Sequence, residues 1–547
     1  MNVQAEWQEK AGRVAAVALL ALLILGYLMP ATGFFKAVPG DLADPRYNSV
    51  VLEHLYRVLT GYPAGLWNPD FYYPFQGMLA FSDNHLGSAA VYALARQAGL
   101  PREYAFDIWF IAGVLLNFGC ALYVLRRLGL STAGAALGAF VFAFGVPVPA
   151  QDTHAQLVYR FASPLAVLAL WQTFEHRRLV GLAAVAGFTV WEFYCSIYLG
   201  LFLVYLLAAL ACALLLQARP LVWAQWRANF AAEPAATKLA ASGALLVSMV
   251  GLGYLGGHYY LISQAYKLDE FRPLEVIKPM LPRIGSYFLA DANPLLAWLG
   301  RGIWVPMRHE HQMFIGFGAA ALVVAAAALA WRGASTNPRL VRAMLIALAV
   351  MFLGTLWTQE VSLYYLIAWM PGIKAIRGVS RIILVMLVPI SVLVAIGADS
   401  ILRMLQPGTR LAPAVLVGLV ALVGIEPLAM EKQTTPIKDW RARADAVKAL
   451  LPTDVPRQAI LLLRTGSTDL SEQIYTELDA MVVGQDLGLP VLNGYSAFVP
   501  PGYRLGPCAS ARQRLMGYQL FTRAESVDDY ARRLIVLDSG PCPAAAR

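Results

Sequence analysis

The sequence has few charged residues, no low-complexity segment and no internal repeat. Only 14% of its 547 residues are charged, whereas soluble globular proteins carry about 25%. Hydrophobic residues make up 59% of the chain, and they recur in runs of about 20, the length that crosses a bilayer. This composition argues against an ordinary soluble enzyme and predicts a mainly α-helical, polytopic membrane protein.

The chain also has few cysteines, five in all. Cys120, Cys195 and Cys212 lie in apolar runs, where a lone cysteine behaves as a small hydrophobic residue. Cys508 and Cys542 lie in the polar C-terminal region and could form a disulfide if that region faces an oxidising compartment. Their spacing resembles no zinc site, so the cysteines predict no bound metal.

The net charge of +9 comes largely from the loops between apolar runs. The basic loops are 126–131, 175–178, 217–238, 331–342 and 403–410. They fall on the same side as the N-terminus, which the positive-inside rule places in the cytoplasm. No basic stripe interleaved with aromatic residues is present, so we expect no nucleic-acid partner. We therefore expect a membrane crossed many times, with the N-terminus in the cytoplasm and the C-terminus on the outer side.

Hydropathy predicts eleven membrane spans, and the first is expected to be retained because no convincing cleavage site follows it. The spans are 14–35, 104–125, 132–149, 156–174, 179–191, 194–217, 238–262, 312–331, 340–358, 382–402 and 411–428. Residues 1–429 then form a transmembrane module, whose large outer loops are 36–103 and 263–311. Residues 430–547 are predicted to form a small α/β domain on the outer side, with a strand at 457–464 and a helix at 441–451.

The first outer loop is predicted to hold two helices that lie along the membrane surface. Residues 47–61 have apolar side chains at helical spacing, and within them Glu53 and Arg57 are spaced to pair at i, i+4. Residues 81–100 are apolar in part, but charged residues interrupt them, which favours an interfacial helix over another span.

Chemistry-bearing residues gather on the predicted outer face. The stretch "VPGDLADPRYN", residues 38–48, presents Asp41 and Asp44 directly after the first span. One interpretation is a solvated loop with a helix cap. The other is a catalytic acid held at the membrane surface. Further polar candidates on this face are Glu53, His54, Asp83, His85 and His154.

Two more outer segments carry charge. "IKAIRGVSR", residues 373–381, places Lys374, Arg377 and Arg381 against the positive-inside trend, on nearly one helical face. Arginine suits phosphate geometry, so this segment predicts a cradle for an anionic lipid head group. The alternative is a set of snorkelling anchors. "HEH" at 309–311 lacks the spacing of a zinc motif and is expected to be a satisfied interfacial pair of histidines.

Four stretches resemble the GT-C glycosyltransferases, which include the protein O-mannosyltransferases and the aminoarabinose transferases of lipid A. They are "GDLADPRYNSVVLEH" (40–54), "YPFQGMLAFSDNHLG" (73–87), "IKAIRGVSR" and "NGYSAFVPP" (493–501). The resemblance implies transfer of a sugar from a polyprenyl-phosphate-linked donor to an envelope glycan, lipid or protein on the outer face, with inversion. It gives the role of base to Asp41 or Asp44, and the role of stabilising the leaving phosphate to the three cations of 373–381.

Which aspartate is the base stays open at this point, because "GD" favours Asp41 and the following "RY" favours Asp44. A divalent cation between these acids and the phosphate also stays open, since no ligand spacing argues for one. Two other hypotheses are a transporter or flippase of a lipid-linked glycan and a non-catalytic envelope protein of the same fold. A transporter would need polar or broken helices near the bilayer midplane, and the acids cluster at one surface instead.

Overall fold

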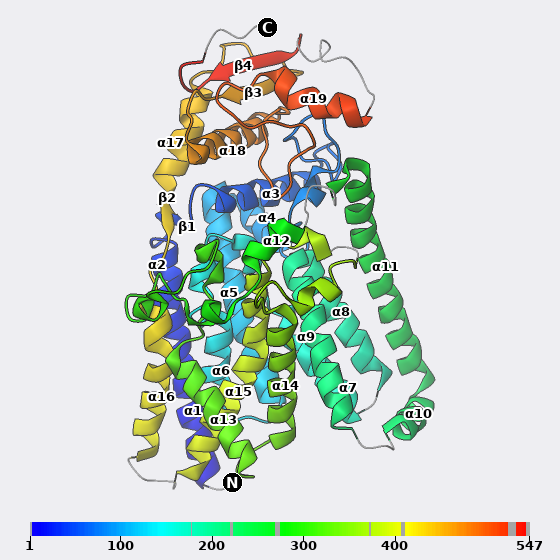
Figure 1. Cartoon of the computed structure of the whole chain (residues 1–547), viewed down its shortest axis with the longest axis vertical. Helices are drawn as coiled ribbons and strands as arrows, with labels where there is room; N and C mark the ends of the chain where they lie inside the picture. Colours follow the sequence, from blue (N-terminus) through cyan, green and yellow to red (C-terminus); the bar gives the residue numbers. More distant parts are fainter. Residues whose placement is uncertain are drawn as a thin grey trace.

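The computed structural model describes residues 3–176, 178–218, 222–268, 274–370, 373–405, 411–522 and 532–542. A long bundle of helices is capped at one end by the C-terminal region, and the two ends of the chain lie at opposite ends of the molecule (Figure 1). Parts of the predicted basic loops, at 177, 219–221 and 406–410, and of the outer loops, at 269–273 and 371–372, lie outside the described residues.

Each of the eleven predicted spans corresponds to a helix. Eight stretches within the described residues are long and apolar enough to cross a membrane: Glu9–Ala31, Arg102–Arg127, Thr132–Gln151, Ile197–Leu216, Ala235–Tyr266, Pro338–Thr355, Val379–Met404 and Leu411–Leu428. Their helices are α1 (Val3–Leu23), α2 (Met29–Ala31), α5 (Arg102–Arg127), α6 (Thr132–Phe144), α9 (Ile197–Leu216), α11 (Ala235–Tyr266), α14 (Pro338–Thr355), α15 (Ile383–Met404) and α16 (Leu411–Leu428). The shorter helices are α7 (Ala162–His176), α8 (Leu179–Cys195) and α13 (Phe317–Trp331). A polytopic membrane protein is thus confirmed, whereas the count of eleven spans is not.

Helix α15 lies at the centre of the bundle, and its apolar window is completely buried. Helix α6 packs closely against it because α6 has glycines at the crossing. A Cβ atom on Gly134 would lie 2.7 Å from the Ala395 carbonyl oxygen, and one on Gly138 would lie 2.4 Å from that of Ser391. Any larger residue at these two positions would push the helices apart.

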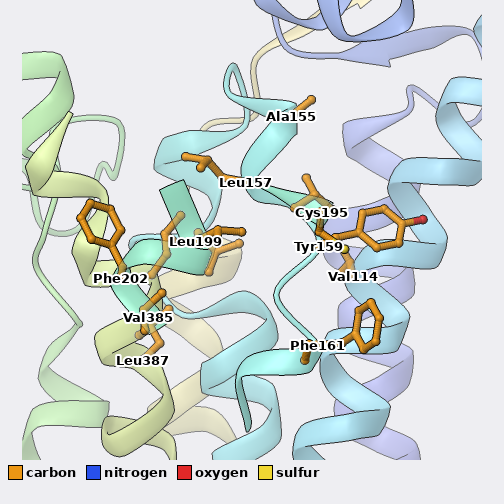
Figure 2. Close-up of a cluster of buried hydrophobic side chains, with 14 of the residues drawn as sticks. Val114, Ala155, Leu157, Tyr159, Phe161, Cys195, Leu199, Phe202, Val385 and Leu387 are labelled. Carbon is orange, nitrogen blue, oxygen red and sulfur yellow. The ribbon is translucent and has the colours of Figure 1, made fainter. Parts of the chain in front are cut away.

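Residues 155–161, between α6 and α7, pack into the core below the end that carries the polar residues. Figure 2 shows Leu157, Tyr159 and Phe161 from this segment among side chains of α5, α9 and α15. The Tyr159 hydroxyl donates to the Trp109 carbonyl of α5 at 2.8 Å, so this buried polar group is satisfied. The anchored segment fixes the loop just before it, which carries His154.

The remaining elements lie mostly outside the bundle. They are α3 (Asp44–Leu59), α4 (Ala89–Gln97), α10 (Val222–Ala232), α12 (Leu274–Ile277), α17 (Ile437–Lys448), α18 (Leu470–Leu487), α19 (Ala511–Thr522), β1 (Ala37–Pro39), β2 (Thr434–Pro436), β3 (Ile460–Arg464) and β4 (Leu534–Asp538). Helix α3 lies across the end of the bundle beneath α18 (Figure 1). Both helices predicted in the first outer loop are present, and α3 is largely buried between the bundle and the C-terminal region.

The C-terminal region contains the predicted strand and helix, as β3 and α17. Strand β3 pairs in parallel with β4, and Leu461 of β3 also forms a parallel bridge to Val491, after the crossover through α18. Backbone groups of residues 70–73 bond to those of 491–493, so the first outer loop is hydrogen-bonded directly to this region. The predicted Cys508–Cys542 disulfide is present, with the Cα atoms 5.5 Å apart.

Two local predictions are wrong. Glu53 does not pair with Arg57. The Glu53 carboxylate accepts hydrogen bonds from Nε and Nη2 of Arg96 on α4, and Arg57 donates a hydrogen bond to Asp70. Tertiary contacts from α4 and the loop therefore override the i, i+4 spacing. The helix expected at 81–100 covers only α4, because polar side chains shape the backbone before it. Residues 82–88 form turns in which the Asn84 side chain accepts the Leu86 N–H.

Candidate functional site

The stretch 38–48 is shaped by a strand end and a helix start. Strand β1 pairs with β2 and ends at Pro39, and Gly40 follows with φ +86°, a conformation that favours glycine. A Cβ atom at Gly40 would lie 2.4 Å from Pro45, which also requires glycine there. The Asp41 carboxylate accepts the Ala43 N–H at 2.8 Å, closing a tight turn, and α3 begins at Asp44. The "PGDLAD" spacing therefore places two carboxylates on one rigid corner.

This corner opens onto a polar cavity of about 660 Å³ between the bundle and the C-terminal region. Its lining residues are Asp41, Ala43, Asp44, Tyr47, Asn48, Ala80, Phe81, Ser82, Asp83, Ala150, Thr153, His154, Gln156, Ile197, Tyr198, Tyr259, His309, Glu310, Arg377, Arg381, Gln433, Tyr495, Ser496, Ala497 and Phe498. Six of the ten predicted site residues are among them, although they come from four segments that are far apart in sequence. The cavity has the size of a small-molecule site.

The two aspartates have different environments. Asp44 accepts a hydrogen bond of 2.8 Å from the Tyr495 hydroxyl, and its other oxygen lies 3.9 Å from His154 Nε2. Burial raises the pKa of Asp41, and the charge of Asp44 adds to this, although the Ala43 N–H opposes it. A raised pKa makes Asp41 a stronger base than an ordinary aspartate, and the hydrogen bond from Tyr495 holds Asp44 against the C-terminal region.

The Asp83 side chain, from the first outer loop, lies against the N-terminus of α9. Its carboxylate accepts the Ile197 N–H at 2.6 Å and the Ser196 hydroxyl at 3.2 Å, so it binds orphan donors at the helix N-terminus. Burial raises the pKa of Asp83 to about 6, against the opposing effect of these hydrogen bonds. The carboxylate therefore changes charge near neutral pH inside the cavity.

Glu310 and Arg381 form a buried ion pair in the cavity wall. Arg381 Nε and Nη2 donate to the two Glu310 oxygens at 2.9 and 2.8 Å, and His154 Nε2 lies 3.6 Å from Glu310. Although burial opposes ionisation, Arg381 and His154 hold the pKa of Glu310 well below its usual range. Much of the Arg381 charge is thus already matched within the protein.

Arg377 differs from Arg381 although both were predicted to share one helical face. Residues 376–378 are not helical, because the Tyr198 hydroxyl accepts the Arg377 N–H at 3.1 Å and the Gly378 N–H at 3.5 Å. The predicted shared face is therefore wrong. Arg377 is exposed and lines the cavity, and its guanidinium makes no ion pair within the described part of the chain.

Glu53 and His54, both predicted to contact substrate, do not line the cavity. Both are buried on α3. Glu53 is neutralised by Arg96, which joins α3 to α4, and the His54 Nε2 lies 3.0 Å from the Leu66 carbonyl oxygen. Their contacts fix the first outer loop.

His85 and Lys374 also lie outside the cavity lining. His85 Nε2 lies 2.7 Å from the Asn48 side-chain oxygen, and burial lowers the pKa of His85 to about 3, so the ring is neutral. It orients Asn48, which does line the cavity. Lys374 is half-buried in a short helical turn ahead of Arg377.

Sequence reasoning missed the roles of Glu310, Tyr198 and Tyr495. A carboxylate between two histidines in an outer loop was a signal for Glu310, but its partner Arg381 lies 71 residues later. Tyr495 belongs to "NGYSAFVPP", and only the fold shows that this segment reaches Asp44. Among the described residues, no group of three or more His, Cys, Asp or Glu side chains is arranged to hold a metal ion. A divalent cation between the acids and a phosphate, which the sequence left open, is not tested by this arrangement.

No family model matches the sequence, and no curated protein matches it. Among solved structures, one match is the arabinofuranosyltransferase AftD from Mycobacteria, with TM-score 0.41 and 15% identity, covering 84% of this chain and 30% of that chain. Another is the archaeal oligosaccharyltransferase AglB from Archaeoglobus fulgidus, solved with an inhibitory peptide and a dolichol-phosphate, with TM-score 0.46 and 13% identity, covering 94% and 68%. This chain thus spans less than a third of AftD. Both matches are membrane glycosyltransferases of the GT-C superfamily, the class that the sequence motifs resemble. At these scores they carry no information about donor, acceptor or catalytic residues here.

Proposed function

We propose that this protein transfers a sugar from a polyprenyl-phosphate-linked donor to an acceptor on the extracytoplasmic face of the bacterial inner membrane. The observation that carries the proposal is the cavity itself. Two aspartates on a rigid corner line it, together with an arginine that makes no ion pair with any described residue. The basic loops at the N-terminal end support a cytoplasmic N-terminus, which would put the cavity end outside. The acceptor is an envelope glycan, lipid or protein.

In this proposal Asp41 is the general base. It takes the proton of the acceptor hydroxyl, the acceptor oxygen forms the new bond to the anomeric carbon, and the bond to the donor phosphate breaks with its electron pair leaving on the phosphate. Attack opposite to the leaving group inverts the anomeric centre. The raised pKa of Asp41 makes its carboxylate a stronger base than that of an ordinary aspartate. Asp44 orients the acceptor.

Arg377 is the cation best placed to meet the phosphate. Its guanidinium is free of carboxylate partners among the described residues, whereas Arg381 is held by Glu310. A planar guanidinium can donate two parallel hydrogen bonds to a phosphate group, and it stabilises the negative charge that develops as the leaving group departs. Arg381 contributes indirectly, because it keeps the Glu310 carboxylate from facing the phosphate unpaired.

The test is a set of chain variants expressed in cells that lack the native gene, with envelope glycans measured by mass spectrometry. Asp41→Asn should lower the product about 10²–10⁴-fold, the usual contribution of a general base. Asp44→Asn should lower it less. Asp445→Asn, an equivalent change at an exposed position on α17, is the matched control and should change nothing. If Asp41→Asn inserts normally and every glycan is unchanged, the proposal is wrong.

A further inference from the structure

Two loops beside the cavity end of the bundle expose large apolar side chains. Residues 284–307 lie between α12 and α13, and residues 361–370 follow α14. Their exposed apolar residues include Phe288, Trp298, Trp304, Leu366, Trp369 and Met370. Trp304 is 83% exposed and Trp369 is 78% exposed, far more than indole rings usually tolerate in water.

The segments that lead into the two loops contact each other, which brings the loops into one layer. The Trp357 N–H donates to the Pro282 carbonyl at 2.7 Å, which joins the chain just before one loop to the chain just before the other. Lys278 pairs with Glu360 and also lies 5.0 Å from the centre of the Trp357 ring. The layer lies at the level where α13 and α14 meet the outer loops, between the bundle and the C-terminal region (Figure 1).

The backbone of this layer is irregular, with short 3₁₀ turns at Ile284–Phe288, Ala297–Gly300 and Leu363–Leu366. Irregular backbone exposed to lipid does not occur in the hydrocarbon core, because its polar groups would lack partners. Two indole N–H groups are satisfied internally, since Trp298 donates to the Leu295 carbonyl at 2.9 Å and Trp369 to that of Leu366 at 2.6 Å. Their apolar rings thus remain available for another contact. Tryptophan is enriched at the depth of lipid head groups for this reason.

We infer that residues 284–307 and 361–370 insert into the head-group layer of the leaflet on the C-terminal side of the bundle. The occupant of this apolar surface is the membrane interface itself. The surface follows from helix ends, exposure and backbone geometry and does not depend on any enzymatic activity.

A consequence that does rest on the proposed function concerns donor access. Arg377 lies seven residues after Met370 in the chain and lines the cavity. With Met370 at head-group depth, a phosphate carried on a lipid can reach Arg377 while its hydrocarbon tail stays in the leaflet. The sugar enters the cavity and the tail does not have to leave the bilayer.

The test is the depth of single spin labels in the full-length protein, reconstituted in vesicles of phosphatidylcholine and phosphatidylglycerol. Cys120, Cys195 and Cys212 are first replaced by alanine, and the disulfide is kept. Labels at Trp304→Cys and Trp369→Cys are compared with Val324→Cys, a lipid-facing position 66% exposed in the middle of α13. A further control is Val499→Cys in the C-terminal region. The measured quantity is the accessibility of each label to oxygen relative to a water-soluble nickel complex.

Labels at 304 and 369 should fall between the two controls. Readings equal to that of Val499 would overturn the inference, since the loops would then lie in water. A label-free measurement guards against misfolded variants: the fluorescence lost in Trp304→Phe/Trp369→Phe should be quenched more by lipids brominated near the head group than by aqueous iodide. The opposite order would also overturn it. Neither result depends on glycosyl transfer, so a failure of the proposed function leaves this test intact.

Discussion

The prediction that most directly tests the link between the C-terminal region and the cavity concerns the buried Glu477. Its carboxylate accepts hydrogen bonds from Asn493 at 3.1 Å, the Gly494 N–H at 2.9 Å and the Tyr503 hydroxyl at 2.8 Å. It also accepts Nη1 and Nη2 of Arg514 at 2.8 and 2.6 Å. The side chains of Glu477 and Arg514 are each only 3% exposed. Gly494 directly precedes the loop 495–498, which forms one wall of the cavity.

Glu477→Gln keeps the shape of the side chain but leaves Arg514 charged and buried without its counter-ion. Breaking a buried pair in this way costs about 3–5 kcal/mol, whereas replacing both partners can be neutral. We therefore expect Glu477→Gln to lower the free energy of local opening around residues 491–498 by about 3–5 kcal/mol. The double variant Glu477→Gln/Arg514→Met should be at least as stable as Glu477→Gln alone, because no uncompensated charge remains.

Hydrogen exchange of peptides from 491–498, followed by mass spectrometry, measures this local opening directly. Glu472→Gln is the matched control: it lies on the same helix, its side chain is 39% exposed, and its pair with Arg443 should contribute under about 1 kcal/mol. Two results would refute the reasoning. One is that the losses of local opening free energy in Glu477→Gln and Arg514→Met simply add in the double variant. The other is that Glu477→Gln loses no more of this free energy than Glu472→Gln.

Three further predictions address the cavity and the disulfide. Arg377→Gln should weaken binding of a polyprenyl phosphate in nanodiscs about 10-fold or more, as expected for a charged hydrogen bond, and Lys374→Gln, outside the cavity lining, should change it less than about twofold; equal losses would contradict the phosphate assignment. As pH rises through about 6, Asp83 ionises and repels the donor phosphodiester, so the affinity for the donor should fall in the native protein but not in Asp83→Asn. The pKa of Asp83 in the folded protein lies above the unfolded value of about 3.9. The free energy of unfolding should therefore decrease between about pH 4 and pH 6 and then level off. Cys508→Ser should destabilise the C-terminal region by about 2–4 kcal/mol, because the disulfide joins two cysteines that are 34 residues apart in sequence. An unchanged midpoint of thermal unfolding would contradict this prediction.

The candidate site illustrates where sequence reasoning stops. Asp41 and Asp44 could be selected because they directly follow the first span in a stretch that resembles a known family, and Arg377 because it departs from the positive-inside trend. The partners could not: Tyr495 lies 451 residues from Asp44, and no periodicity connects them. The i, i+4 spacing of Arg377 and Arg381 wrongly predicted a shared helical face. The Tyr198 hydroxyl accepts the backbone N–H groups of Arg377 and Gly378, which a continuous helix would have used. Local patterns report local structure, and a cavity lined by residues from many separate segments is a tertiary property.

The sequence by itself determined that the chain crosses a membrane many times, since runs of apolar residues long enough to span a bilayer have no other stable location. It also indicated Cys508 and Cys542 as the candidates for a disulfide, because the other cysteines lie in apolar runs, and the structure shows the bond. Only the tertiary structure decided which charges are free. Glu53 is neutralised by Arg96 and Arg381 by Glu310, while Arg377 faces the cavity. The physical reason is that a buried charge is stable only beside an opposite charge or hydrogen-bond partners. The sequence does not reveal which residues the fold brings within reach of it.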